Sequence, residues 1–304
     1  MKQDMSVSLG KLKLKNPVMA ASGTFGYAEE FADLLDLKKL GAVVSKTVTI
    51  NPRQGNPAPR TCETPAGMLN SIGLENPGIE AFIEEKLPVL RKSGVPVIVS
   101  IASETDPQEF VSLARRLDKL DGIAALELNI SCPNLKKNKL VSQDPEATYS
   151  LVKAVRKACG KTLITKLSPN VADITEIALA AEKAGSDCLA LINTVYGMSI
   201  DINKRRPKIA MGTGGLSGPA IKPIAVRMVR EVYKKVKTPI IGIGGIMTSE
   251  DALEFIIAGA SAVSVGTANF VDPGSSSEII EGLGKYLRAN RIKNIKALTG
   301  SLKE

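Results

Sequence analysis

The residue best suited to acid–base chemistry in this sequence is Cys132. Histidine is absent from the 304 residues, so another side chain must move protons near neutral pH. Cys132 lies in the polar stretch Asn-Ile-Ser-Cys-Pro-Asn (129–134), directly after an apolar run. A thiol ordinarily titrates at about pH 8.5, so its thiolate can serve as a base or a nucleophile. Cys159 and Cys188 are interpreted as packing residues, and Cys62 has no chemical interpretation.

Polar residues also stand at the ends of several apolar runs. The carboxyl ends of parallel barrel strands meet at one face, so these side chains would converge there. They are Ser22, Lys46, Ser100, Asn129, Lys166, Asn193 and Thr194. A lysine at the top of a buried strand is costly unless an anion or a hydrogen-bond acceptor meets it. We therefore expect a ligand site at this face, although strands that leave the core for water also end in polar residues.

Glycine-rich turns follow the last two apolar runs. Gly244 and Gly245 come after the seventh run, and Gly266 and Thr267 come after the eighth. Backbone without side chains lets several N–H groups approach phosphate oxygens, and barrels often bind phosphate at these two loops. A third turn, at 212–218, could add donors. Tight turns that need φ > 0 are the alternative explanation, but two such turns in these positions favour a phosphate-bearing cofactor.

The elements that must position these residues alternate between short β-branched runs and amphipathic helical stretches. The candidate strands are 18–22, 42–47, 95–101, 125–130, 162–167, 188–194, 239–244 and 262–266. Most are apolar throughout, as expected of parallel strands that are covered on both faces. Helical patterns include 107–120, 145–158, 174–184 and 249–258. Asp144 and Thr248 are the expected N-caps, and Gly185 and Gly259 stand where helices should end.

Eight β–α units in one chain predict a (β/α)8 barrel, a TIM barrel, with insertions at its C-terminal face. A doubly wound open sheet is the alternative, but no G-x-G-x-x-G follows the first candidate strand. Two connections, roughly 50–77 and 196–219, are too long for plain loops and are expected to form lids or substrate walls. Because no linker is evident, residues 1–304 are predicted to form a single domain.

The composition excludes several classes of function. Without histidine there is no Ser-His-Asp triad and no histidine-ligated zinc, and without a C-x-x-C pair no metal site is expected. The net charge of +9 is spread along the chain and aromatic content is 4%, which favours a solvated face or the attraction of anionic ligands over a nucleic-acid groove. No apolar stretch approaches about 18 residues, so we expect no membrane segment and a cytoplasmic location.

Longer motifs occur in a fixed order along nearly the whole chain. They are NPVMAASGTFGY (16–27), SKTVT (45–49), GNPAPRTCETPAGMLNSIGLENPG (55–78), LELNISCPN (126–134), KLSPN (166–170), INTVYGMSID (192–201), GTGGLSGPAIKPIA (212–225), IGIGGI (241–246) and VGTA (265–268). The combination of ETPAGMLNSIGLENPG with NISCPN is the most specific. Together the motifs resemble the class 1 dihydroorotate dehydrogenase family, and most of all the catalytic subunits of its NAD-linked B type.

This resemblance implies a flavin-binding barrel with FMN across its mouth. The flavin would contact Ser22, Lys46, Thr47, Ser100, Asn129, Lys166 and Ile192. Its phosphate would meet Gly218, Gly244, Gly245, Gly266 and Thr267. Dihydroorotate would be held by Lys46, Asn70, Ser71, Ile72, Gly73, Leu74, Asn129, Asn193 and Thr194. This chain departs from the family at Ser100, where asparagine is common.

The resemblance also implies the reaction and its partners. Cys132, on a loop near 131–140 that closes in the family, would remove the C5 proton of dihydroorotate while a hydride passes to FMN. The product, orotate, belongs to pyrimidine (UMP) biosynthesis. Electrons would reach NAD through a partner subunit that carries FAD and a [2Fe–2S] cluster, on a homodimeric core of a heterotetramer.

Two other classes of protein remain as alternatives. One is an FMN barrel like the tRNA-dihydrouridine synthases, which would normally carry a C-terminal RNA-binding domain. The other is a non-catalytic barrel that binds a phosphate-bearing ligand and would hold no chromophore.

Overall fold

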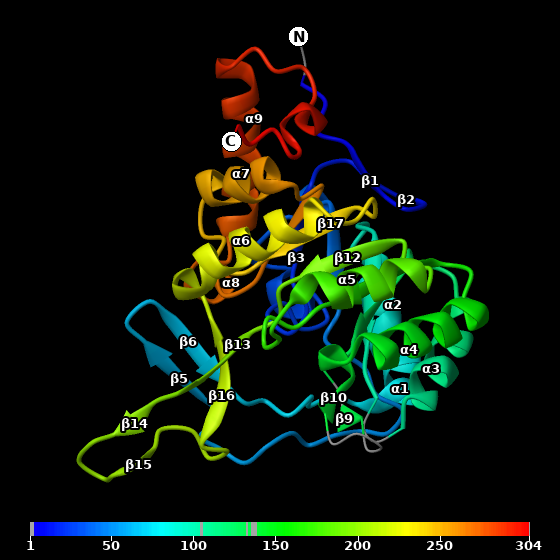
Figure 1. Ribbon diagram of the computed structural model, residues 1–304, viewed down its shortest axis with the longest axis vertical. Helices are drawn as coiled ribbons and strands as arrows, with labels where there is room; N and C mark the ends of the chain where they lie inside the picture. Colours follow the sequence, from blue (N-terminus) through cyan, green and yellow to red (C-terminus); the bar gives the residue numbers. More distant parts are fainter. Residues whose placement is uncertain (1–2, 104–105, 132, 135–138, 304) are drawn as a thin grey trace.

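Eight parallel strands close into a barrel in the computed structural model, which describes residues 3–103, 106–131, 133–134 and 139–303 (Figure 1). The strands are β3 (Val18–Ala20), β4 (Ala42–Val44), β7 (Val97–Ile101), β8 (Ala125–Asn129), β11 (Thr162–Lys166), β12 (Cys188–Leu191), β17 (Ile240–Ile243) and β18 (Ala262–Val265). Each pairs with the next in this order, and β18 pairs with β3 to close the ring. The predicted barrel is confirmed, because an open sheet would have two free edges.

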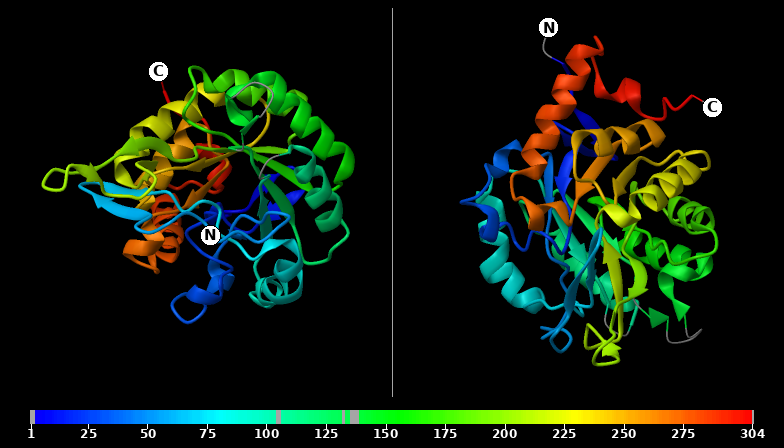
Figure 2. Two further views of the ribbon diagram at one scale, coloured as in Figure 1. Left: turned by 90° about the horizontal axis from the view of Figure 1, so that it is seen from below. Right: turned by 90° about the vertical axis from the view of Figure 1, so that its left-hand side faces the viewer.

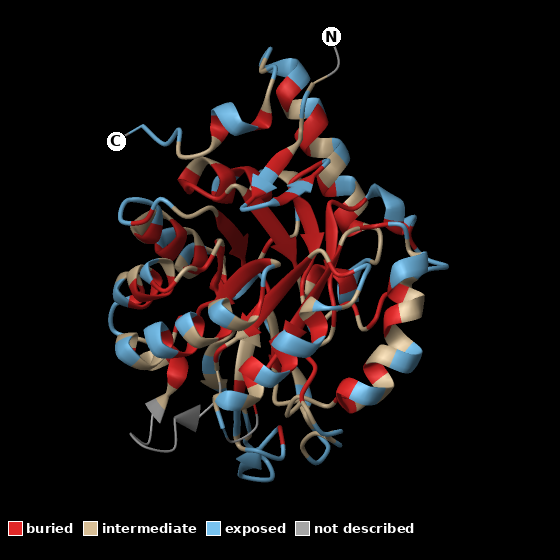
Figure 3. Cartoon of the chain, turned by 90° about the vertical axis from the view of Figure 1, so that its right-hand side faces the viewer, coloured by how far each residue is buried: buried red, intermediate tan, exposed pale blue. Residues whose placement is uncertain are grey.

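Helices surround the ring of strands (Figure 2, left). They are α1 (Gly78–Ala81), a π-helical turn (Phe82–Lys86), α2 (Leu87–Lys92), α3 (Gln108–Asp118), α4 (Pro145–Ala158), α5 (Ile174–Lys183), α6 (Lys222–Tyr233), α7 (Ser249–Ala258), α8 (Ala268–Val271) and α9 (Ser275–Ala289). Each longer helix buries one stripe, as α3 does with Phe110, Leu113 and Leu117. Figure 3 shows the result: buried strands at the centre, and helices that are buried inward and exposed outward.

The helix boundaries follow from the capping residues that the sequence indicates. The Asp144 carboxylate accepts the backbone N–H groups of Glu146 and Ala147, at 2.9 and 3.2 Å, and α4 starts at the next residue. Thr248 and Asp251 form a reciprocal capping box at the start of α7. Gly259, with φ +135°, ends that helix. These predicted helix ends are confirmed.

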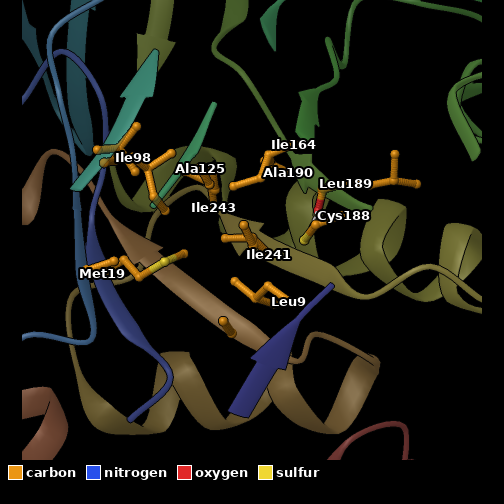
Figure 4. Close-up of a cluster of buried hydrophobic side chains, with 14 of the residues drawn as sticks. Leu9, Met19, Ile98, Ala125, Ile164, Cys188, Leu189, Ala190, Ile241 and Ile243 are labelled. Carbon is orange, nitrogen blue, oxygen red and sulfur yellow. Dashed lines mark hydrogen bonds between the residues drawn. The ribbon is translucent and has the colours of Figure 1, made fainter. Parts of the chain in front are cut away.

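The inside of the barrel is filled by alternate residues of the strands. Ile98, Ala125, Ile164 and Ile241, from β7, β8, β11 and β17, gather there (Figure 4). Strand side chains alternate between the two faces, so the residues between them point outward to the helices. All four are at most 2% exposed. The next inward position on a strand is two residues further along and lies nearer the cavity end of the barrel.

The two long connections form an antiparallel sheet that the sequence did not predict. Its order is β13 (Val195–Met198), β16 (Thr213–Ser217), β6 (Gly67–Asn70) and β5 (Thr61–Thr64). A small hairpin, β14 (Ile200–Asp201) with β15 (Arg206–Pro207), extends it. The sheet projects from the barrel (Figure 1) and stands where walls of a site were expected.

Shorter elements complete the chain. They are the hairpin β1 (Val7–Leu9) and β2 (Leu12–Leu14), the pair β9 (Pro133–Asn134) and β10 (Lys139–Leu140), and 3-10 turns at Glu29–Phe31, Leu37–Lys39, Val141–Gln143, Pro219–Ile221 and Ile295–Leu298. Both termini lie near α9, and the Asp4 N–H donates to the Lys293 carbonyl at 2.9 Å (Figure 1). Within the described ranges, no helix combines the length and apolarity that crossing a membrane requires.

Candidate active site

A cavity of about 610 Å³ opens at the carboxyl ends of the barrel strands. Ligand and cofactor sites commonly occupy about 300–1,000 Å³, so the space suits a cofactor together with a small substrate. Most residues that the sequence predicts for the site line it. They are Ser22, Lys46, Thr47, Asn70, Ser71, Ile72, Gly73, Leu74, Asn129, Lys166, Ile192, Asn193, Thr194, Gly218, Gly244, Gly245, Gly266 and Thr267.

Ser100 lies behind the cavity wall instead of in it. The side chain is fully buried, and its Oγ is 3.0 Å from Oγ1 of Thr47. Thr47 in turn lies 3.2 Å from the Ser22 hydroxyl, which donates to the Ser45 carbonyl at 2.8 Å. Strand β7 continues one residue past Ser100 and keeps this side chain inside the barrel. The structure therefore gives Ser100 a place beneath Thr47 and does not bring it to the cavity.

Cys132 lies outside the described residues, so its position relative to the cavity stays a prediction. The residue before it, Ser131, does line the cavity. The loop that carries Cys132 thus leaves the barrel at the site.

Lys46 supplies a cation to the cavity. It follows β4, and its backbone N–H donates to the Gly26 carbonyl at 2.9 Å, which fixes the start of the side chain. Burial lowers the pKa of the Lys46 ammonium; the nearby Glu75 opposes this effect and Arg60 adds to it. Among the described residues, no group forms a hydrogen bond with its Nζ, and no carboxylate lies within ion-pair distance of it. A lysine in these surroundings is suited to an anionic ligand.

The other two cations of the cavity are already paired. Arg60 contacts the Glu75 carboxylate in a close ion pair. Lys166 Nζ lies 4.0 Å from Oε1 of Glu127, and both side chains are almost fully buried. Among the described cavity cations, Lys46 is consequently the one whose charge no protein carboxylate offsets at close range, so it should attract a ligand carboxylate most strongly.

A cluster of amides occupies one wall. The Asn193 side-chain amide donates to Oδ1 of Asn129 at 3.4 Å and to Oγ of Ser131 at 3.2 Å. Its own Oδ1 accepts the N–H of Thr194 at 2.8 Å, and the Thr194 carbonyl accepts from Asn170 at 3.0 Å. Amide side chains offer both donors and acceptors, so this wall suits a neutral ring that carries C=O and N–H groups.

A second wall comes from the loop that follows β6. The Asn70 amide donates to the Gly215 carbonyl at 3.3 Å, which ties β6 to β16. Asn56 holds the next residues, because its side chain donates to the Ser71 carbonyl and its N–H to the Ile72 carbonyl, both at 2.9 Å. Contacts to backbone carbonyls therefore hold the segment Asn70 to Leu74 at the cavity. Neither the local sequence nor its periodicity predicts these contacts.

The glycines form a cradle of exposed backbone. Gly245 has φ +75°, and a Cβ there would lie 2.8 Å from the Gly218 carbonyl oxygen. Gly218 has φ +95°, and its Cβ would lie 2.7 Å from the Cα of Gly67. Only glycine allows these turns to pack so closely. Nearby, the Thr267 hydroxyl donates to Oγ of Ser217 at 2.8 Å. No carboxylate lies among the described residues of this cradle, so its backbone N–H groups fit a phosphate, and the two hydroxyls can rotate toward one.

Sequence reasoning missed several residues of the site. Arg60, Glu75, Ser131, Ser217 and Phe270 also line the cavity. Arg60 and Glu75 lie in the quoted motif at 55–78, but only the fold shows that they pair. Glu127, beneath Lys166, did leave a signal: an acidic residue two positions before Asn129 in an apolar strand must point into the barrel.

A parallel barrel with cations, amides and a glycine cradle at its mouth belongs to the class of barrel enzymes that bind phosphate-bearing cofactors. Comparison with known proteins narrows the class. The sequence profile described as Dihydroorotate dehydrogenase matches residues 4–287. The chain therefore belongs to the dihydroorotate dehydrogenase family, whose members depend on a flavin.

Curated relatives are similar to the chain over nearly its whole length. Proteins from Geotalea uraniireducens, Trichlorobacter lovleyi and Geobacter sulfurreducens are 57%, 56% and 54% identical, each over 99% of both chains. Each is named "Dihydroorotate dehydrogenase B (NAD(+)), catalytic subunit". The resemblance that the motifs indicated is confirmed.

Proposed function

We propose that this protein oxidises dihydroorotate to orotate in pyrimidine biosynthesis, with FMN as its flavin and NAD as the final electron acceptor. The observation that carries the proposal is the convergence of the family's motif residues on one cavity in a chain that matches the family model over residues 4–287. The names of the relatives support the NAD-linked type.

The cavity residues fall into two groups that suit the two ends of FMN. The cradle of Gly218, Gly244, Gly245, Gly266 and Thr267 would hold the phosphate through backbone N–H groups and a hydroxyl. The barrel-mouth residues would contact the flavin ring: Ser22, Lys46, Thr47, Asn129, Lys166 and Ile192. Bound FMN supplies the hydride acceptor for the reaction. Ser100 would support this surface through Thr47.

The substrate would lie against the amide cluster and the loop after β6. Asn129, Asn193 and Thr194 offer donors and acceptors to the carbonyl and N–H groups of the dihydroorotate ring. Residues 70–74 would close the other side. The substrate carboxylate would meet Lys46, because burial lowers the pKa of its ammonium and an anion beside it would offset that cost.

Cys132 would be the base that removes the C5 proton. A thiolate is the strongest candidate in a chain without histidine, and its neighbour Ser131 lines the cavity. A loop that covers the substrate would exclude water and make the thiolate a stronger base.

A second subunit would carry the electrons onward. The relatives are named as catalytic subunits, which implies another subunit in their complexes. For this chain we propose a partner with FAD and a [2Fe–2S] cluster, around a homodimer of barrels, in the cytoplasm.

The rival functions make different predictions about substrate. A tRNA-dihydrouridine synthase-like barrel would reduce a uridine in RNA, and a binding protein would carry out no redox chemistry. Purified protein mixed with dihydroorotate without oxygen should lose its yellow flavin absorbance and release one orotate per flavin. A colourless protein, or a flavin that dihydroorotate leaves oxidised, would refute the proposal.

A further inference from the structure

Glu127 is a carboxylate enclosed in the barrel below the cavity. It lies on β8 two residues before Asn129, so both side chains point to the inside. Its register neighbours are Ser100 on β7 and Ile164 on β11, and Ile164 lies among the apolar side chains of Figure 4. Only 2% of Glu127 is exposed. A charge in such a place is costly without a partner, so a structural role alone would be served better by an apolar residue.

The partner of Glu127 is Lys166, one layer nearer the cavity. Lys166 Nζ lies 4.0 Å from Oε1 of Glu127, too far for a hydrogen bond. Oε1 is buried and accepts no hydrogen bond in the described part of the chain. Lys166 lines the cavity, and none of its three ammonium protons has a hydrogen-bond acceptor among the described residues. The ammonium thus stands between a buried carboxylate and the cavity.

We propose that Glu127 is a positioning residue that sets the reduction potential of the bound flavin through Lys166. The proposal rests on the proposed function, because it requires FMN in this cavity. Glu127 holds the Lys166 ammonium at the cavity floor and offsets part of its charge. A flavin gains negative charge when it is reduced, so Lys166 favours the reduced form and Glu127 moderates that preference.

The test is the midpoint potential of bound FMN in Glu127→Gln, which removes the charge but keeps the shape. The expected result is retained FMN and a potential raised by about 30 mV or more, a tenfold gain in preference for reduced flavin in a two-electron couple. Lys166→Met should lower the potential, and the double variant should match Lys166→Met, because Glu127 acts through the Lys166 ammonium. Ser264→Ala is the control. Ser264 also has a buried Oγ without a partner, but it lies on β18, four strands away around the barrel.

Glu127→Asp separates charge from packing. It keeps the charge and changes the shape, so its potential should lie closer to wild type than that of Glu127→Gln. If Glu127→Gln does not fold, Glu127→Asp decides, because withdrawing the carboxylate from Lys166 should still raise the potential slightly. An unchanged or lowered potential in Glu127→Gln, or in Glu127→Asp if Glu127→Gln does not fold, would overturn the role of Glu127. A larger shift in Glu127→Asp than in Glu127→Gln would overturn it as well. A wild-type chain that binds no FMN would instead overturn the proposed function, and this inference with it.

Discussion

Replacing Lys46 by methionine should weaken orotate binding more than any other single change of a cavity cation. Arg60 and Lys166 have carboxylate partners in the structure, whereas Lys46 has none among the described residues. Methionine keeps most of the length of the side chain and removes its charge. The substitution therefore removes the attraction between the ammonium and the ligand carboxylate, and the use of FMN-loaded protein separates this loss from any loss of flavin binding.

The size of the expected loss in orotate affinity follows from the burial of Lys46. Two unit charges about 4 Å apart attract by about 4 kcal/mol at an effective dielectric constant of about 20. Desolvation of the ligand carboxylate offsets part of this, and hydrogen bonds to charged groups contribute about 1.5–3 kcal/mol net. Because about 1.4 kcal/mol is a factor of ten, orotate should bind roughly 10- to 150-fold more weakly to Lys46→Met.

The assay is a titration of the FMN-loaded protein with orotate, followed by the flavin spectrum across a pH series. Orotate needs the protonated lysine, so affinity should be constant at low pH and fall as pH rises through the pKa of Lys46. Burial lowers that pKa, so the loss should begin at a lower pH than for an ordinary lysine. Lys92→Met, on the exposed surface of α2, is the control. Equal affinities for wild type and Lys46→Met, or an equal loss in Lys92→Met, would show that the Lys46 ammonium does not bind the orotate carboxylate.

Three further substitutions test the proposed base, the glycine cradle and the capping box of α7. Cys132→Ala should keep FMN and orotate binding but slow flavin reduction by dihydroorotate at least roughly a hundredfold in a single turnover; an unchanged rate excludes Cys132 as the base. Gly245→Ala should lower FMN affinity and destabilise the fold by about 1 kcal/mol or more, because its Cβ would lie 2.8 Å from the Gly218 carbonyl oxygen. Gly160→Ala, where a Cβ meets nothing closer than 3.9 Å, is the comparison in urea unfolding, and equal effects would contradict the cradle. Asp251→Asn should cost about 1–3 kcal/mol at neutral pH. Burial raises the pKa of Asp251, but hydrogen bonds from Lys222 and from backbone amides outweigh it and leave the pKa lowered. Its stabilisation is thus complete above about pH 4 and is lost as pH falls through the lowered pKa, so unfolding curves of variant and wild type should converge in acid; a gap that persists there would contradict the assignment.

The barrel could be predicted because its strands are buried on both faces. Short, continuous apolar runs such as 162–167 fit few structures other than a strand that is covered on both faces. Every observed barrel strand lies within its predicted range. Helix ends were predictable for a local reason as well, since Asp144 and Thr248 accept hydrogen bonds from residues two or three positions away.

The antiparallel sheet was not predictable from periodicity. Strand β16 has the sequence Thr-Gly-Gly-Leu-Ser and lacks an apolar alternation, so its strand form depends on distant partners such as Leu69, opposite Leu216. Pairing of this kind is fixed by the fold and not by neighbours in the sequence.

Within the site, the rule that strand-end residues face the cavity worked for Asn129 and Lys166 and failed for Ser100. The difference is register: Asn129 and Lys166 lie opposite each other at the cavity, whereas Ser100 lies opposite Glu127, one inward layer lower and behind Thr47. A sequence pattern does not determine this register between strands.

FMN and dihydroorotate are proposed to meet in this cavity beneath Cys132. A crystal structure of the protein loaded with FMN and orotate tests it most directly. We expect the phosphate on the cradle of Gly218, Gly245 and Thr267, and orotate against Asn193. The Cys132 sulfur should lie on the face of orotate that is turned away from the flavin. Flavin bound elsewhere, or a Cys132 sulfur packed away from the orotate ring, would contradict it.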